Sequence, residues 1–259
     1  MSAQFVDEVD ENIRRLAEAS DLPQKSLDWM MAVGTTGNYP YNFSWLGRPI
    51  IQYPQDMVAM QELIWSIKPD LIIETGIAHG GSLVFSASML ALLDLDDAIA
   101  AGNTIDPKAS SRKVLGIDID IRTHNRASIE AHPMASRIQM IEGSSIAPET
   151  IAQVKEVVKN YRPILVFLDS NHTHDHVCAE LEAYSSLVTV GSYCVVFDTL
   201  IEDIPAGSFP DKPWDIGNNP RTAVEAFIKT NDRFEVDYNM DAKLQISVAP
   251  GGYLKCVSE

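Results

Sequence analysis

Apolar and polar residues alternate along this chain in blocks that predict a succession of strands and helices from residue 71 onward. Five short apolar runs, at 71–74, 114–117, 138–141, 164–168 and 193–197, are typical of strands buried on both faces. Stretches with helical spacing separate them, at 81–93, 122–131, 148–159 and from about 174 to 187. Strand–helix alternation of this kind predicts an α/β fold with a mostly parallel sheet and helices on both of its faces.

The two ends of the chain depart from this alternation. Residues 1–30 predict one or two helices, and 31–55, which carry glycine, proline and aromatics without periodicity, predict an ordered loop or cap. A helix over 54–67 is expected to stop at Lys68-Pro69. We therefore divide the chain into a helical and aromatic cap, 1–55, and a main domain, 56–259.

After Asp198 the pattern loosens into a segment rich in proline and glycine, 199–220, which also holds Phe209 and Trp214. Loops of this length are usually functional or disordered, so we interpret it as a loop that covers the substrate, with an ordinary packed connection as the alternative. A helix over 221–229 and strands near 234–238 and 244–248 are expected to follow. Residues 253–257 could extend that last hairpin.

Composition restricts the class of protein further. A chain of 259 residues with 46% apolar residues can bury the core of one α/β domain, and it has no apolar run long enough for a membrane span. A formal net charge of −16 disfavours nucleic acid as a partner, because binding to phosphates needs Lys and Arg. An acidic N-terminus without an apolar signal region, and three unclustered cysteines, predict a cytoplasmic protein.

The first predicted strand runs into the sequence IETGIAHGGS at residues 73–82. Its glycines allow a tight turn into a helix whose N-terminus suits polar or anionic groups. The spacing matches neither a dinucleotide-binding fingerprint nor a P-loop. Glu74, Gly76 and Gly80 instead form an E-x-G-x-x-x-G pattern, which resembles the first motif of class I S-adenosylmethionine-dependent methyltransferases.

Two further strand ends carry the same resemblance. Asp118 ends the second predicted strand, where this family uses an acidic residue for the ribose hydroxyls, with Asp120 as the neighbouring candidate. Ser144 follows the third strand in a turn that resembles the family's adenine-contacting turn. The resemblance implies a seven-stranded, mostly parallel sheet whose last strand is antiparallel. The cofactor-binding residues that it implies are Glu74, Gly76, Gly80, Ser82, Asp118, Ser144 and Asp169.

Asp169, His172 and Asp198 follow the fourth and fifth predicted strands. Because neighbouring parallel strands bring their carboxyl ends together, these side chains are expected to converge in a ligand-binding crevice. Two carboxylates and a histidine there predict a site for a hard metal ion beside a general base. We expect His174 and His176, in contrast, to have polar surface or capping roles.

The segments GIDID, LDSNHTH and VVFDT resemble the cephalosporin hydroxylase/rhamnosyl O-methyltransferase family over roughly residues 50–250. This resemblance implies that Asp169 and Asp198 hold Mg²⁺ and that His172 deprotonates the acceptor hydroxyl. Related enzymes often carry another acidic residue beside the last aspartate, where this chain has Phe197 and Thr199. Thr199 is therefore a candidate ligand, with water, Glu202 or Asp203 as alternatives.

The resulting hypothesis is a metal-dependent O-methyltransferase that acts on a sugar hydroxyl. The acceptor would be a glycan, glycolipid or glycosylated metabolite, as in polysaccharide or lipopolysaccharide biosynthesis, and the N-terminal helices suggest a possible homo-oligomer. Two alternatives stay open: a non-catalytic partner of a hydroxylase that binds S-adenosylmethionine, and a metal-dependent hydrolase.

Overall fold

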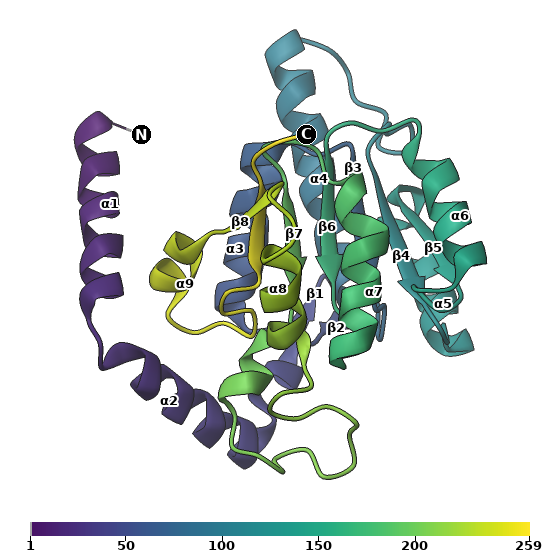
Figure 1. The fold of residues 1–259 in the computed structure, drawn as a ribbon. Coiled ribbons are helices and arrows are strands. Elements are labelled where there is room, and N and C mark those ends of the chain that lie inside the picture. The colour runs from purple at the N-terminus through teal and green to yellow at the C-terminus, as the bar shows by residue number, and fades with distance from the viewer. Residues whose placement is uncertain (1) are drawn as a thin grey trace.

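A seven-stranded sheet with helices on both faces forms the centre of the structure, a computed structural model that describes residues 2–259 (Figure 1). The strands lie in the order β5-β4-β3-β6-β7-β9-β8. β3 to β7 are parallel, and β9 is antiparallel to both β7 and β8. Their bounds are β3 Leu71–Thr75, β4 Lys113–Asp118, β5 Ile138–Glu142, β6 Ile164–Leu168, β7 Tyr193–Val196, β8 Phe234–Val236 and β9 Tyr253–Cys256. The expected sheet with an antiparallel last strand is confirmed.

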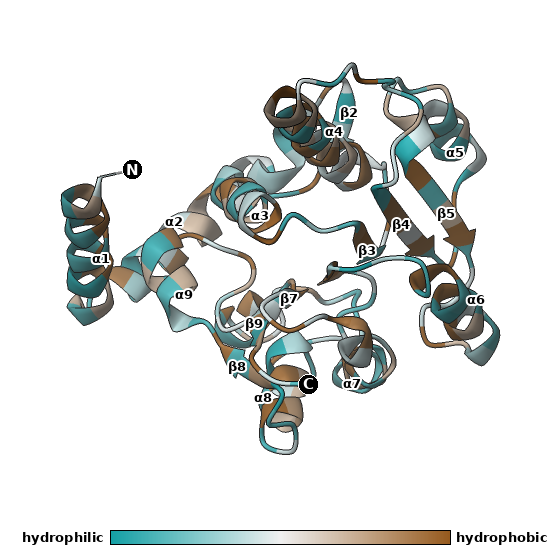
Figure 2. Ribbon diagram, turned by 90° about the horizontal axis from the view of Figure 1, so that it is seen from above, coloured by the Kyte–Doolittle hydropathy of each residue, from teal (hydrophilic) through white to brown (hydrophobic). Residues whose placement is uncertain are grey.

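Two sets of helices cover the two faces of this sheet (Figure 2). One set is α3 (Pro54–Ile67), α4 (Gly81–Ala101) and α5 (Thr123–Glu130), and the other is α6 (Pro148–Val158), α7 (His174–Tyr184) and α8 (Pro220–Ile228). In β6, Leu165 and Phe167 pack toward the first set, while Val166 and Leu168 pack toward the second. Burial on both faces explains why the central strand β6 is apolar at every position.

The predicted helix over 54–67 and strand over 164–168 have the expected bounds. The predicted strand at 244–248 is wrong: Tyr238–Leu244 form a short helix, α9, capped by the Asp237 side chain, and the residues after it are irregular. The backbone N–H of Val248 donates to the buried carboxylate of Asp56 instead of to a neighbouring strand. β9 is therefore the last strand. α4 also extends eight residues beyond the predicted 81–93, to the left-handed Gly102.

The N-terminal segment is more regular than its sequence predicts. The expected helices are α1 (Ala3–Glu18) and α2 (Leu22–Gly37), and the supposed loop contains a 3-10 helix, η1 (Tyr39–Asn42), and a hairpin of β1 (Phe43–Trp45) and β2 (Arg48–Ile50). The hairpin packs on α4, where the Trp45 ring meets Phe85 edge-on and its Nε1 donates to Ser88 Oγ at 2.9 Å. A glycine is required at 81, because a Cβ there would lie 2.1 Å from the Pro49 carbonyl oxygen.

α1 is the outermost element of the structure and lies against α9 (Figure 1). None of its residues is buried. Over the described residues, 2–259, no helix combines the length and the apolar character that crossing a membrane requires.

The register of the parallel strands aligns their carboxyl ends. Thr75 pairs with Ile117 on one side and with Leu168 on the other, and Asp118 pairs with Glu142. The side chains that follow these strands therefore meet at one edge of the sheet, as expected for a ligand-binding crevice.

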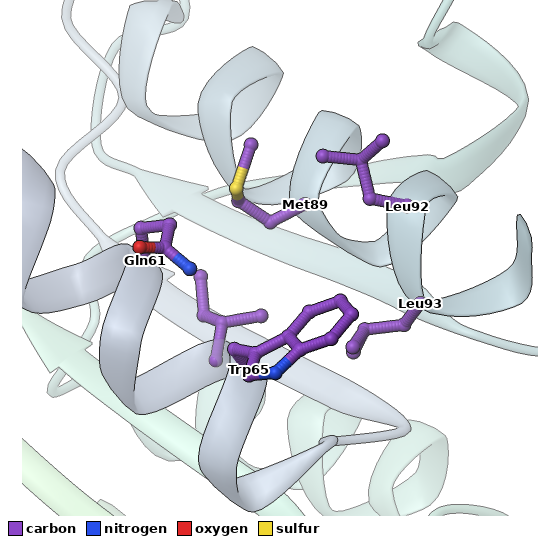
Figure 3. A pocket seen from close by; sticks show the side chains of 6 residues that line it. Gln61, Trp65, Met89, Leu92 and Leu93 are labelled. Carbon is purple, nitrogen blue, oxygen red and sulfur yellow. The ribbon is translucent and has the colours of Figure 1, made fainter. Parts of the chain in front are cut away.

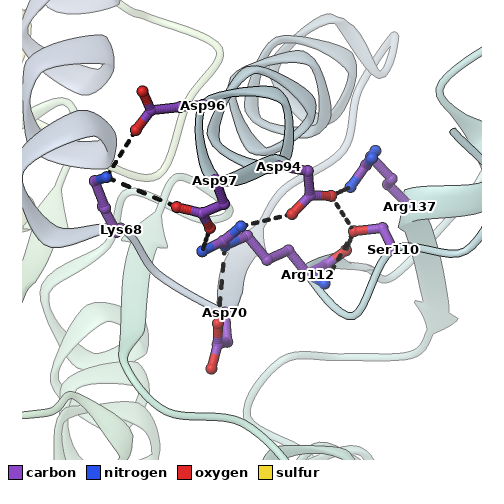
Figure 4. A network of polar contacts seen from close by, with 8 residues as sticks. All are labelled: Lys68, Asp70, Asp94, Asp96, Asp97, Ser110, Arg112 and Arg137. Carbon is purple, nitrogen blue, oxygen red and sulfur yellow. Dashed lines mark hydrogen bonds and ion pairs between the residues drawn. The ribbon is translucent and has the colours of Figure 1, made fainter. Parts of the chain in front are cut away.

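The opposite edge of the sheet is held by a network of ion pairs (Figure 4). The Arg112 guanidinium bonds Asp94 at 2.6 Å and Asp97 at 2.7 Å, and the nearly inaccessible Arg137 bonds the other oxygen of Asp94. The network ties the end of α4 to the starts of β4 and β5. Its members are Lys68, Asp70, Asp94, Asp96, Asp97, Ser110, Arg112 and Arg137.

The outward side of α3 and α4 carries an apolar pocket (Figure 3). Its lining residues are Gln61, Ile64, Trp65, Met89, Leu92 and Leu93. The Trp65 and Leu92 side chains stay about half exposed there. This pocket shares no lining residue with the crevice at the strand ends.

Replacing Asp94 with alanine should lower the free energy of unfolding by about 3 kcal/mol, because it leaves the buried Arg137 guanidinium without its carboxylate. Urea denaturation measures this loss. The matched control is Glu156→Ala, which removes the exposed partner of Lys159 and should cost less than about 1 kcal/mol. Equal losses in the two variants would contradict a structural role for the network.

Candidate functional site

The predicted functional residues do gather at the carboxyl edge of the sheet, because β3 and β6 approach each other closely there. Gly76 has a φ of +89°, and a Cβ on it would lie 2.0 Å from the carbonyl oxygen of Asp169. Any side chain at 76 would therefore push the ends of the two strands apart. The glycine that the sequence pattern singled out is required by this contact.

The turn between β3 and α4 is held from three sides. Asp118 Oδ2 accepts hydrogen bonds from the backbone N–H groups of Ile77 and Ala78, at 2.8 and 3.2 Å. Asn125 Nδ2 donates to the Ala78 carbonyl at 2.8 Å, and Arg48 donates to the carbonyl of His79. Asp118 thus shapes the turn itself, and its Oδ1, which accepts one hydrogen bond from the Asp120 N–H, keeps lone-pair capacity for a ligand.

Below this turn lies a small cavity of about 20 Å³. Its lining residues are Gln52, Met60, Glu74, Thr75, Gly76, Ser82, Phe167, Asp169 and Phe197. Glu74 is buried, and its carboxylate accepts a hydrogen bond from Ser86 Oγ in α4. Burial raises the pKa of Glu74 to about 7, although hydrogen bonds from Ser86 and Ser82 oppose the rise.

Asp169, His172 and Asp198 form a compact acidic cluster beside the cavity. One potential ligand atom from each lies within 4.8 Å of the others, and His172 Nε2 is 3.2 Å from Asp198 Oδ2. Burial raises the pKa of Asp169 well above its ordinary value, and the nearby carboxylates of Asp198 and Glu74 raise it further. A divalent cation would remove this repulsion, and the donor atoms suit one, so the cluster fits a hard metal ion.

Asp198 adopts a left-handed backbone conformation, with a φ of +57°. Side-chain-bearing residues adopt it at a cost, and such residues concentrate at functional sites. The conformation turns the chain directly after β7 into a short 3-10 helix, η4 (Thr199–Asp203).

The segment after η4 closes one side of the cluster. The ring of Trp214 contacts the ring of His172 edge-to-face, with centroids 4.7 Å apart. Glu202 fixes this segment by accepting hydrogen bonds from the Gly217 N–H and from the side chain of the buried Asn219. Trp214 is therefore a wall of the site, and Glu202 holds the part of the chain that follows it.

A stripe of residues spaced by four along α7 joins two strand ends from below. His176 Nε2 lies 3.0 Å from Ser145 Oγ, in the turn after β5, and 3.2 Å from Ser170 Oγ, after β6. Ser170 donates to the buried Glu180 at 2.6 Å, and Tyr184 donates to the Ser145 carbonyl. This arrangement fixes the turn that holds Ser144 relative to Asp169.

Several expectations about the polar residues need correction. His176 is not a surface residue, because α7 turns it inward to the two serines. Glu202 and Asp203 do not fold back to the cluster: Glu202 holds the Trp214 segment, and Asp203 pairs with Arg221. The reason is that η4 directs both carboxylates toward α8.

Thr199 and His174 have structural partners. The Thr199 hydroxyl is fully buried and donates to the Pro250 carbonyl at 2.7 Å, which gives Thr199 a structural role in place of the expected role as a metal ligand. His174 has the polar role expected of it, since its Nδ1 lies 2.8 Å from Thr222 Oγ1 and joins α7 to α8.

The residues of the site that the sequence did not point to include Arg48, Gln52 and Asn125. Arg48 and Gln52 come from the hairpin and the residues after it, which contact the site only through tertiary packing. Asn125 lies near the start of α5, where an asparagine usually indicates a helix cap. None of the three stands at the end of a parallel strand, so the pattern that found the other residues could not find them.

The strand order, the glycine turn and the acidic strand ends together define a class I methyltransferase fold. The sequence profile of the family described as "Rhamnosyl O-methyltransferase/CmcI" matches residues 37–257, and the chain belongs to this family.

Individual relatives agree with this assignment. The chain is 29% identical to a rhamnosyl O-methyltransferase of Mycobacterium leprae over 224 residues, which cover 84% of this chain and 85% of the relative. It is 28% identical to a rhamnosyl O-methyltransferase of Mycobacterium tuberculosis (strain H37Rv) over 77% of this chain and 72% of the relative.

Solved structures agree on the fold. A CmcI structure without ligand superposes with a TM-score of 0.56 and 18% identity, covering 85% of this chain and 78% of that one. A CmcI structure described as containing Mg and SAM gives a TM-score of 0.53, also at 18% identity, over 84% of this chain and 78% of that one.

The raised pKa of Glu74 predicts a stability that depends on pH. The pKa is about 7 in the folded protein and near 4.5 when the group is exposed, so the folded state holds the proton more tightly and stability falls as pH rises from about 5 to about 7. Glutamine does not titrate. The free energy of unfolding of Glu74→Gln, relative to that of the wild type, should therefore rise by roughly 3 kcal/mol between pH 5 and pH 8. Denaturation curves at the two pH values measure this, and an unchanged difference would contradict the buried-charge account.

Proposed function

We propose that this protein is an S-adenosylmethionine-dependent O-methyltransferase that uses a divalent metal ion and methylates a hydroxyl of a sugar, with a rhamnosyl group as the first acceptor to test. The observation that carries the proposal is the position of the acidic cluster directly across from the β3–α4 turn, with Gly76 packed on Asp169. Membership of a family whose relatives are named as rhamnosyl O-methyltransferases supports the reaction and the acceptor.

In this proposal the two sides of the crevice have different tasks. The β3–α4 turn, Asp118 and the turn at Ser144 bind the cofactor, which when bound supplies the methyl group. Asp169 and Asp198 hold the metal ion, which when bound would polarise the acceptor hydroxyl and balance the clustered carboxylates. Gly80 and Ser82, which the sequence also predicts to bind the cofactor, share the task of the β3–α4 turn.

His172 is the proposed general base. Its Nε2 faces Asp198 Oδ2, and a carboxylate in that place orients the ring and stabilises its protonated form. The hydroxyl proton would then be accepted at Nδ1. Trp214, packed edge-to-face on His172, gives the acceptor side an aromatic wall and limits access of water to the base.

His172 could instead be a third metal ligand, because it belongs to the same cluster. Mg²⁺ prefers oxygen ligands, which favours the role of base. If His172 is a ligand, loss of its imidazole weakens metal binding. If it is the base, metal binding stays unchanged.

The replacement His172→Ala should lower turnover by about 10²–10⁴-fold while the affinities for S-adenosylhomocysteine and Mn²⁺ stay unchanged. Transfer of labelled methyl from S-adenosylmethionine to rhamnosyl acceptors measures turnover, and calorimetry measures binding. His124→Ala, in the exposed part of α5, is the matched control and should behave as the wild type. Wild-type turnover in His172→Ala would rule out the base, and loss of Mn²⁺ binding would make His172 a ligand.

The same assays separate the alternative functions. A wild-type protein that binds S-adenosylhomocysteine but methylates no sugar would favour a non-catalytic partner. A protein that binds Mn²⁺ but not the nucleoside would favour a metal-dependent hydrolase. The glycine turn proposed to bind the cofactor favours methyl transfer over the hydrolase, and relatives named as O-methyltransferases favour it over a non-catalytic partner.

A further inference from the structure

The small cavity below the β3–α4 turn contains a polar atom that has no partner. Gln52 is 4% exposed, and its side-chain Oε1 is buried without a hydrogen bond. Buried polar groups nearly always have a partner, and an unpaired one is unfavourable unless a ligand or a water molecule satisfies it. An unpaired carbonyl oxygen in a binding site therefore points to a donor that arrives from outside.

The position of Gln52 is fixed by its backbone. It lies between the β2 strand and the first residue of α3, and its N–H donates to the Pro40 carbonyl at 3.1 Å. The side chain lines the same cavity as Glu74, Ser82 and Asp169. The cap thus contributes directly to a wall of the site, although its sequence carries no motif.

The groups that line the cavity differ in their chemistry from an ordinary water site. Gln52 offers an unpaired acceptor, Glu74 a buried carboxylate, and the hydroxyls of Ser82 and Ser86 are engaged with Glu74. Such a wall suits a ligand that brings several N–H donors and a positive charge. A volume of about 20 Å³ admits one group the size of a water molecule, which is also the size of an ammonium.

We propose that Gln52 and Glu74 together bind a primary ammonium group, and that Gln52 is a cofactor-binding residue contributed by the N-terminal cap. The inference rests on the proposed function, in which the ligand is the α-ammonium at the amino-acid end of S-adenosylmethionine. Two N–H donors would go to Glu74 and Gln52 Oε1, and the charge would balance the carboxylate. The cap then takes part in holding the cofactor as well as in covering the sheet.

Two ligands separate this contact from the rest of the nucleoside site. S-adenosylhomocysteine carries the ammonium, whereas 5′-methylthioadenosine has the same nucleoside and thioether but no amino-acid end. Replacing Gln52 with leucine keeps the size of the side chain and removes the acceptor. Calorimetry on Gln52→Leu should show S-adenosylhomocysteine bound at least about tenfold more weakly, with 5′-methylthioadenosine unchanged, as expected for a lost hydrogen bond to a charged group.

Two further variants control the experiment. Gln52→Glu keeps an acceptor, so its affinity for S-adenosylhomocysteine should stay within about threefold of that of the wild type. This variant also tests the contact if the leucine variant does not fold. Gln61→Leu makes the same chemical change in the apolar pocket on the outer side of α3 and should alter neither affinity.

The outcomes distinguish this inference from the function on which it rests. Unchanged affinity of Gln52→Leu for S-adenosylhomocysteine, or an equal loss for both nucleosides, would overturn the role of Gln52 and leave the proposed function in place. A tenfold loss in Gln52→Glu would overturn it as well. A wild-type protein that binds neither nucleoside would instead refute the proposed function.

Discussion

The repulsion among carboxylates at the carboxyl edge of the sheet is the constraint on which the rest of the site depends. Asp169 and Asp198 converge there because β6 and β7 are parallel neighbours, and Glu74 lies close behind them. Burial and mutual repulsion raise the pKa of Asp169, so the arrangement is unfavourable without a compensating positive charge. We propose two positive charges, a divalent metal ion at Asp169 and Asp198 and an ammonium at Glu74. Both would compensate the negative charge of the clustered carboxylates.

Backbone geometry then decides how near the two charges come to each other. Gly76 allows β3 and β6 to meet without a side chain between them, and Asp118 holds the turn above through two backbone N–H groups. The α7 stripe of His176 and Glu180 fixes the neighbouring turns from below. A reaction that needs donor and acceptor within bonding distance depends on this kind of rigid placement.

The sequence predicted the parts of the fold and site that depend on local pattern. Buried parallel strands are mostly apolar, so their carboxyl ends could be located from the sequence. Glu74 and Asp118 lie at the ends of β3 and β4, and Asp169 and Asp198 come just after β6 and β7. The strand expected at 244–248 failed because a side-chain carboxylate, that of Asp56, takes the backbone N–H of Val248. Gln52 and the inward position of His176 depend on packing between distant segments, which no local pattern records.

Metal dependence is the central claim, and removing the metal tests it most directly. The purified protein would be treated with EDTA, freed of the chelator and assayed for methyl transfer from S-adenosylmethionine to rhamnosyl acceptors with and without Mg²⁺. Asp198→Asn would be assayed in parallel, because asparagine tolerates the left-handed backbone at this position and so isolates the loss of charge. We predict that transfer is lost on metal removal, returns with Mg²⁺ in the wild type and returns weakly in the variant. Full transfer by the wild type in the presence of EDTA would contradict the account.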